Sequence, residues 1–202
     1  MAAGLGPRMD ESQPVAWTTY VSTGDSAATA RRITEAGGTI IVEPMDIAPY
    51  GRMTIALDPQ GNAFGLWEAR EHTGVQIYSE PGALAWNELL AADTAAAREF
   101  YGAVFGWTFQ GLGPAAGDPG DMDYTTFSLG ENPLGGLGAA QDGMPTGWLT
   151  CFAVESTDSA VTTAESKGGK VTTPAMDTPF GRFAIIEDPW GAPLEVMGAV
   201  KG

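Results

Sequence analysis

The sequence is poor in several side chains on which common functions depend. It contains one histidine, one cysteine and ten lysines and arginines against 25 aspartates and glutamates, for a formal net charge of −15. A field of that sign repels phosphate backbones and disfavours nucleic-acid binding. No apolar run approaches the roughly 18 residues of a membrane helix, and the first residues lack the basic start and apolar stretch of a signal peptide. We therefore expect a cytoplasmic protein that binds neither nucleic acid nor membrane.

The single cysteine and the single histidine also limit nucleophilic catalysis. With one cysteine no intrachain disulfide can form, which fits a reducing compartment. Cys151 stands in the apolar stretch 148–154 and is predicted to be a buried strand residue. His72 lies in a linker-like segment, so Ser-His-Asp chemistry would require it to reach a pocket from there.

An internal repeat organises the chain. Sliding the sequence by about 131 positions aligns two long segments, beginning with Trp17 on Trp148. With one deletion allowed, the other matches are Ala36-Gly-Gly38 with Lys167-Gly-Gly169, Pro49-Tyr-Gly-Arg52 with Pro179-Phe-Gly-Arg182, and Asp58-Pro-Gln-Gly61 with Asp188-Pro-Trp-Gly191. Ordered matches over roughly 55 residues indicate duplicated structural units.

The start of the chain resembles the end of such a unit. Ala3-Gly-Leu-Gly6 pairs with Gly135-Gly-Leu-Gly138, which closes a middle unit at 75–139. The first copy therefore lacks an upstream partner of about sixty residues, through a truncated start or because the missing half is supplied otherwise. We expect residues 1–70 to be the second half of an N-terminal domain, 71–82 a linker, and 83–200 a complete C-terminal domain of two modules.

Each unit has the pattern of a strand, a helix and three short strands. In the first, a strand at 15–21 precedes a helix at 26–36, which Gly37 and Gly38 end. The other expected helices are 94–105, capped by Asp93 or Thr94 and ended by Gly106, and 157–167. The other expected strands are 39–42, 51–57, 63–67, 85–90, 107–110, 124–129, 133–137, 148–154, 170–173, 183–187 and 193–197. Residues 111–121 are expected to form a Gly-, Pro- and Asp-rich loop.

The residues of the middle helix carry a family resemblance. The run from Asp93 to Trp107, DTAAAREFYGAVFGW, resembles the first helix of glyoxalase I, bleomycin-resistance and extradiol-dioxygenase proteins. So do the two Asp-Pro-x-Gly turns, each followed by an apolar strand. The chain thus resembles the vicinal oxygen chelate superfamily, and most of all its tandem-domain hydroxylase- or glyoxalase-like branch. The resemblance implies an α+β fold whose repeated βαβββ modules form curved mixed sheets around a metal or ligand site.

Few residues are suited to hold a catalytic metal in such a fold. Metal-dependent members use His and Glu side chains, and three or four protein ligands are needed. Here the first-strand ligand position falls near Asn87, with Glu88 on the opposite face of a regular strand. In the third unit the corresponding first-strand position falls near 149–151, again without a histidine. Glu195 matches the family's terminal glutamate, and in the first copy Gly65 stands at the equivalent position. We predict no metal cofactor; the alternative is a divalent metal.

What remains is an aromatic, partly polar concavity. Alternation places Trp148, Thr150 and Phe152 on one face of their strand, and Trp86 shares a face with Glu88. The predicted ligand-binding residues are Trp86, Asn87, Glu88, Trp148, Thr150, Phe152, Arg182 and Phe183. The aromatic residues could instead be simple core. Arg182, like Arg52, either pairs with an Asp turn or the backbone, or closes over a carboxylate or enolate oxygen.

These residues support two functions, because the superfamily spans enzymes and drug-sequestering proteins. The first is a glyoxalase-like protein that binds a small hydrophobic or aromatic molecule in the C-terminal domain. The alternative is a hydroxylase-, lyase- or isomerase-type enzyme in which Glu195 is the catalytic base, its pKa raised by burial. The sheet edge and apolar face of residues 1–70 further predict a homodimer in which half-domains complete each other or pack against a C-terminal domain.

Overall fold

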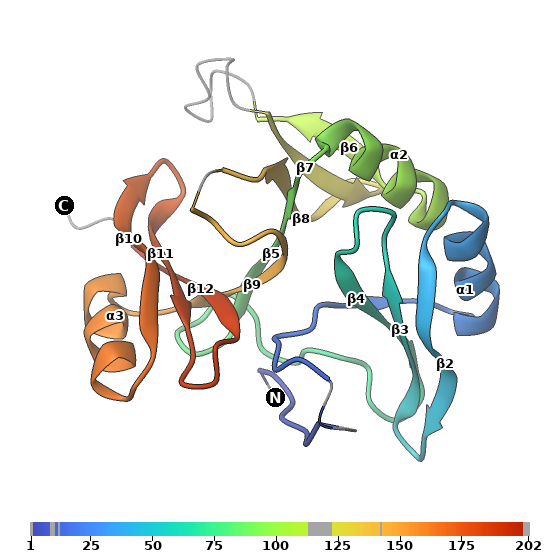
Figure 1. Ribbon diagram of the computed structural model, residues 1–202, viewed down its shortest axis with the longest axis horizontal. Coiled ribbons are helices and arrows are strands. Elements are labelled where there is room, and N and C mark those ends of the chain that lie inside the picture. Colours follow the sequence, from blue (N-terminus) through green and yellow to red (C-terminus); the bar gives the residue numbers. More distant parts are fainter. Residues whose placement is uncertain (1, 9–10, 12, 113–122, 142, 200–202) are drawn as a thin grey trace.

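The computed structural model describes residues 2–8, 11, 13–112, 123–141 and 143–199, and within them the chain forms two mixed sheets and three helices (Figure 1). The predicted α+β class with repeated βαβββ modules is confirmed. Most of the loop expected at 111–121 lies outside the described residues. No described helix is both long and apolar enough to cross a membrane.

The first module forms the four-stranded sheet, in the order β1-β4-β3-β2. Its elements are β1 (Tyr20–Ser22), α1 (Ser26–Glu35), β2 (Thr39–Ile47), β3 (Gly51–Leu57) and β4 (Ala63–Ala69). The first and last strands pair parallel, and β4-β3-β2 run antiparallel. The strand predicted to begin at Val15 begins at Tyr20, five residues later. The strand predicted to end at Val42 continues to Ile47, and its pairing with β3 contains two register shifts.

The second and third modules together form the eight-stranded sheet, in the order β10-β11-β12-β9-β5-β8-β7-β6. The middle module comprises β5 (Leu84–Ala91), α2 (Thr94–Phe105), β6 (Thr108–Gly111), β7 (Tyr124–Leu129) and β8 (Asn132–Ala139). The last comprises β9 (Gly147–Ala153), α3 (Thr157–Ser166), β10 (Lys170–Thr178), β11 (Gly181–Glu187) and β12 (Pro193–Gly198). The first strands of the two modules, β5 and β9, meet antiparallel at the centre. In Figure 1 the outer strands of the two modules stand on either side of this pair.

The helix ends follow the predicted capping chemistry. The Asp93 side chain accepts a hydrogen bond from the backbone N–H of Ala96, which satisfies one free donor at the start of α2. Gly106 ends the same helix with φ 71°, a left-handed conformation that costs glycine little. Asp25 and Ser156 cap α1 and α3 in the same way.

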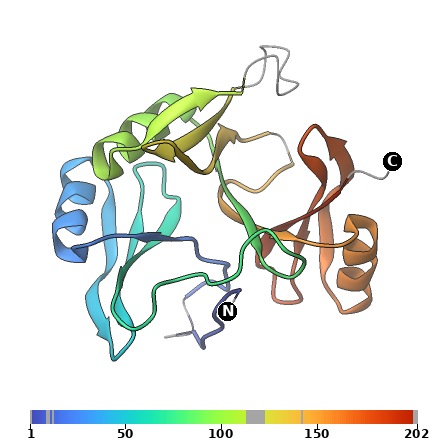
Figure 2. The same ribbon diagram turned by 180° about the vertical axis from the view of Figure 1, so that it is seen from behind.

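A single apolar core joins the first module to the eight-stranded sheet. Phe64 of β4 is fully buried, and its ring lies 5.6 Å from that of Tyr101 and 6.2 Å from that of Phe100 in α2. Figures 1 and 2 show α1 and α2 side by side. The core continues through Trp107, Phe127 and Trp148. Because these side chains come from both sheets, the first module covers the outer face of the C-terminal sheet.

Candidate functional site

The pairing of β5, β9 and β12 decides which side chains share the inner face of the eight-stranded sheet. Trp86 pairs with Cys151, and Cys151 pairs with Glu195 on its other side. Side chains of paired residues point to the same face, and so do side chains two residues apart on a strand. Glu88 therefore joins Trp86, Cys151 and Glu195 on one face. We take this face, with Tyr124 and Phe183, as the candidate site.

Glu195 is buried on this face, with only 4% of its surface exposed. Desolvation is the main reason why its pKa is raised, to about 8, and the nearby negative charge of Glu88 raises it further. A hydrogen bond with the Cys151 side chain acts in the opposite direction. The pKa of the Cys151 thiol is raised strongly by burial and by the two carboxyl groups, so this thiol stays protonated. Glu195 is thus poised to hold a proton near neutral pH.

Glu88 belongs to a second polar chain on the same face. Burial raises its pKa, while a hydrogen bond with the Tyr124 side chain lowers it. The Trp86 indole Nε1 in turn donates to the Tyr124 oxygen at 3.3 Å. A Cβ atom on Gly136, the partner of Glu88 on β8, would lie 1.8 Å from the Tyr124 oxygen. Glycine is therefore required at 136 for Tyr124 to lie over the sheet beside Glu88.

Four of the predicted ligand-binding residues, all on β5 or β9, lie on the face of the sheet opposite Glu195. Asn87 pairs with Thr150, and its Oδ1 accepts a hydrogen bond from the Thr19 hydroxyl at 3.0 Å. The Trp148 indole donates to the Tyr101 hydroxyl at 2.9 Å inside the shared core. Phe152 meets Trp17 edge to face, with ring centroids 5.0 Å apart. The register sets this division, because the partner of Glu88 is Leu149 and not Trp148.

Arg182 also lies away from Glu195. It neighbours Phe183 on β11 and so faces the other way, toward α3, where it pairs with Asp158 at 3.0 Å and Asp177 at 2.9 Å. The predicted pairing with the Asp188 turn is wrong for Arg182, since Asp158 and Asp177 take that role. Phe183 packs instead with Leu149 and Ile185 on the inner face.

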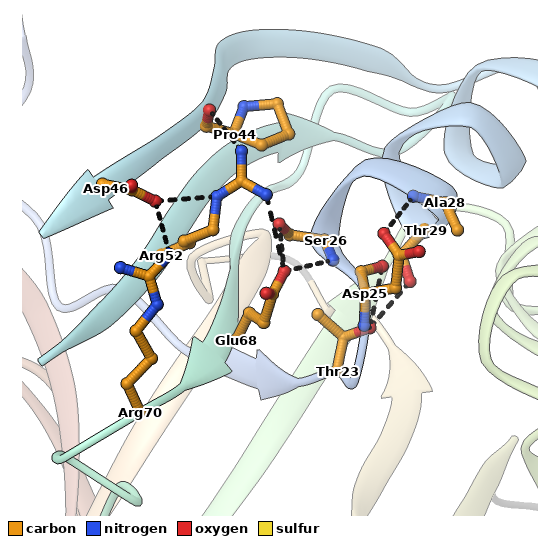
Figure 3. A network of polar contacts seen from close by, with 10 residues as sticks. All are labelled: Thr23, Asp25, Ser26, Ala28, Thr29, Pro44, Asp46, Arg52, Glu68 and Arg70. Carbon is orange, nitrogen blue, oxygen red and sulfur yellow. Dashed lines mark hydrogen bonds and ion pairs between the residues drawn. The ribbon is translucent and has the colours of Figure 1, made fainter.

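The matching arginine of the first module has its own network (Figure 3). Arg52 contacts Asp46 at 2.9 Å and lies 3.9 Å from Glu68, which accepts hydrogen bonds from the backbone N–H and hydroxyl of Ser26. These two bonds, more than Arg52, lower the pKa of Glu68. Arg52 therefore also pairs with carboxylates other than the Asp58 turn, and the network fastens the start of α1 to the sheet.

The inner face does not fit a catalytic divalent metal. Such an ion needs three or four protein ligands, and Glu88 and Glu195 supply two carboxylates. Cys151 stays protonated, which weakens it as a ligand. The next position, Gly136, has no side chain, and Tyr124 covers it. The described residues contain no group of three His, Cys, Asp or Glu side chains placed to hold a metal.

Comparison with known proteins places the fold in a family. The family model of the Glyoxalase/Bleomycin resistance protein/Dioxygenase superfamily matches residues 83–196, which include the whole inner face. The chain belongs to this superfamily. CFP32 of Mycobacterium bovis, named for a glyoxylase, is 36% identical over 197 residues, covering 96% of this chain and 74% of that protein. The anthracycline biosynthesis protein DnrV of Streptomyces peucetius is 35% identical over 201 residues, covering 98% and 71%.

Solved structures of the superfamily share the fold at low sequence identity. The Mn(II)-bound glyoxalase from Novosphingobium aromaticivorans has a TM-score of 0.56 and 13% identity, covering 90% of this chain and 62% of that chain. The 2,3-dioxygenase LapB from Pseudomonas sp. KL28 has a TM-score of 0.54 and 14% identity, covering 87% and 68%. At this identity the likeness concerns the fold alone.

Sequence reasoning missed two parts of the inner face, Tyr124 and the glycine beneath it. Gly135 and Gly136 fall in the strand predicted at 133–137, and the structure confirms that they lie within β8. Glycine inside a strand often marks the close approach of another group. That signal could have pointed to an aromatic residue over Gly136, although it would not have identified Tyr124.

Proposed function

We propose that the C-terminal domain binds a small hydrophobic or aromatic molecule on the inner face of its sheet, without a catalytic metal. The observation that carries this proposal is the burial of Glu195 beside Glu88, with no described basic side chain among the groups that shift either pKa. A buried carboxyl group without a positive partner costs stability, so its retention favours a role in binding. This role needs only the residues of the C-terminal domain.

The surroundings of the two carboxyl groups support an aromatic ligand. Trp86, Tyr124 and Phe183 share the inner face and are each only partly buried. Aromatic rings combined with a few polar groups are typical of small-molecule sites. The names of relatives point the same way, since one is named for glyoxylase activity and another for the biosynthesis of anthracyclines.

An enzyme of the hydroxylase, lyase or isomerase type is the second candidate function. The pKa of Glu195, raised to about 8, favours it, because a carboxyl group with a pKa near the working pH can both accept and donate a proton. In this case Glu195 would be the catalytic residue that takes a proton from the bound substrate, and Cys151 would orient it.

Tryptophan fluorescence provides the test, since Trp86 lies in the site. Titration with a panel of aromatic compounds should change the emission of the wild-type protein, and Glu195→Gln should alter the affinity. Glu165→Gln makes the same substitution on the exposed side of α3, outside the site, and should leave binding unchanged. If Glu195→Gln abolishes turnover of a ligand and leaves its affinity intact, the enzyme is favoured. Absence of any response across a broad panel would contradict both functions.

A further inference from the structure

The inner face carries two carboxyl groups for which the described residues provide no positively charged partner. The groups that face Glu195 are Glu88 from β5, Cys151 from β9, Tyr124 from β7 and the apolar Ile185 from β11. The acidic groups among these carry no compensating partner, since no described arginine or lysine contributes to the pKa of Glu88 or Glu195. A carboxyl group that ionises here therefore places an unpaired negative charge inside an apolar environment.

Other acidic side chains, such as Glu68 and Asp123, have hydrogen-bond donors and arginines as partners. Glu68 accepts two hydrogen bonds from Ser26 and lies near Arg52. Asp123 accepts from Thr94 and pairs with Arg98 at 3.1 Å. Both have a lowered pKa, because their partners stabilise the charged form. Glu88 and Glu195, by contrast, have only a phenol and a thiol as side-chain partners.

Aromatic rings border the same carboxyl groups. The Trp86 indole and the Tyr124 phenol lie together over Gly136, beside Glu88. The face of an aromatic ring attracts a cation, most strongly when water is excluded. A positive group placed between the two carboxyl groups would gain from both kinds of contact.

We infer that this face selects a protonated amine carried on a flat apolar body. The ammonium group lies between Glu88 and Glu195, where it stabilises the ionised form of both carboxyl groups and displaces the proton that Glu195 otherwise holds. The apolar body lies against Trp86, Tyr124 and Phe183. An anionic ligand is rejected, because it meets two carboxyl groups and no positive partner. This inference rests on the proposed function and names the ligand class of the same site.

A series of three compounds with one ring system isolates the charge. The probes are 1-naphthylmethylamine, 1-naphthylmethanol and 1-naphthoate, titrated against wild-type protein at one ionic strength by calorimetry and tryptophan fluorescence. The amine should bind at least about tenfold more tightly than the alcohol, which corresponds to the effect of one charge-assisted contact. The carboxylate should bind most weakly of the three.

Two variants then locate the charge effect. Glu88→Gln and Glu195→Gln should each reduce the preference for the amine over the alcohol several-fold, and the double variant should reduce it to near unity. Glu165→Gln makes the same change in net charge on α3 and should keep the wild-type preference. Circular dichroism confirms that each variant is folded, and the wild-type series decides the question even if one variant does not fold.

The outcomes separate this inference from the proposed function. If the alcohol binds as tightly as the amine, or the carboxylate binds best, the selectivity for amines is wrong and the ligand site stands. If none of the three binds while other aromatic compounds do, the inference also falls. If no aromatic compound binds at all, both fall together.

Discussion

The first and last modules of the chain, residues 20–69 and 147–198, are two versions of one scaffold. Each has the strand order first-fourth-third-second, and each turns between its third and fourth strands on an aspartate. Asp58 Oδ1 accepts hydrogen bonds from the backbone N–H groups of Gln60 and Asn62, and Asp188 Oδ1 does the same for Trp190 and Ala192. The repeated turns thus preserve the backbone.

The two modules differ on their outer faces. In the first module, the Gln60 side chain exchanges two hydrogen bonds with the backbone of Asp93, and Phe64 is fully buried against α2. In the last, the matching Trp190 is 76% exposed and Leu194 is only partly buried. At these matching positions the first module therefore has residues that pack against the middle module, and the last module has residues that are partly or largely exposed to solvent.

The inner faces differ in the opposite sense. In the first module Tyr20 lies over Gly65, so close that a Cβ there would be 2.3 Å from its ring. In the last module the matching positions are Cys151 and Glu195, which leave a buried carboxyl group. An aromatic ring fills the space in one copy, and ionisable chemistry occupies it in the other. The comparison teaches that the turns preserve the scaffold while the faces determine the role.

The largest expected effect is at the outer-face pair Phe64 and Leu194. Phe64→Ala removes a buried ring from the shared core and should lower the free energy of unfolding by about 3–5 kcal/mol. Leu194→Ala, at the matching position, should cost roughly 1–2 kcal/mol, because less apolar surface is lost. Urea denaturation of both variants measures the difference. Equal losses would show that the two outer faces contribute alike.

The inner-face carboxyl group should make stability depend on pH. In the folded protein the pKa of Glu195 is raised to about 8 from an ordinary 4.5, so the folded state keeps a proton that the unfolded state releases. The free energy of unfolding should therefore fall as pH rises from about 4.5 to 8, by up to about 5 kcal/mol in total.

Denaturation of Glu195→Gln at several pH values tests this expectation. The variant cannot ionise at this position. Its free energy of unfolding should therefore equal that of the wild type near pH 4.5 and exceed it increasingly as pH rises. Glu165→Gln should keep the wild-type slope. A Glu195→Gln curve parallel to the wild-type curve would contradict a raised pKa.

Filling the first module's inner face should be next in size. Gly65→Ala forces a methyl group into the Tyr20 ring and should cost about 1–3 kcal/mol, the usual range for overpacking. The control is Gly24→Ala, where nothing lies within 4 Å of an added Cβ. Thermal unfolding of the two variants should differ clearly; similar midpoints would mean that Tyr20 moves aside at little cost.

The smallest expected effect distinguishes the two turns. Trp190→Gln changes an exposed side chain and should alter the free energy of unfolding by less than about 0.5 kcal/mol. Gln60→Ala removes both hydrogen bonds to Asp93 and should cost about 1 kcal/mol. Chemical denaturation can resolve this difference. A larger loss at Trp190 than at Gln60 would reverse the assignment of open and covered turns.

Local sequence patterns predicted most of the fold, because the signals are local. Asp93 and Gly106 mark the ends of α2 as expected, and the repeat predicted that each module contains a strand, a helix and three strands in that order along the chain. The site was harder, because its membership depends on how β5 pairs with β9. One residue of register decides whether Glu88 or Asn87 faces Glu195, and side-chain alternation within a single strand cannot settle that. The raised pKa of Glu195, by contrast, could be predicted from the sequence, because the apolar residues around it in the chain indicate burial.

The shared core also determines how cooperatively the protein unfolds. Tyr101 of α2 donates its hydroxyl to Asp58 of the first module and accepts from Trp148 of the last, and Phe64 packs on its ring. Side chains from all three modules thus meet at one tyrosine. Melting of any one module would expose the same buried surface of the other two. Heat should therefore unfold all three together, in a single calorimetric transition whose van't Hoff and calorimetric enthalpies agree.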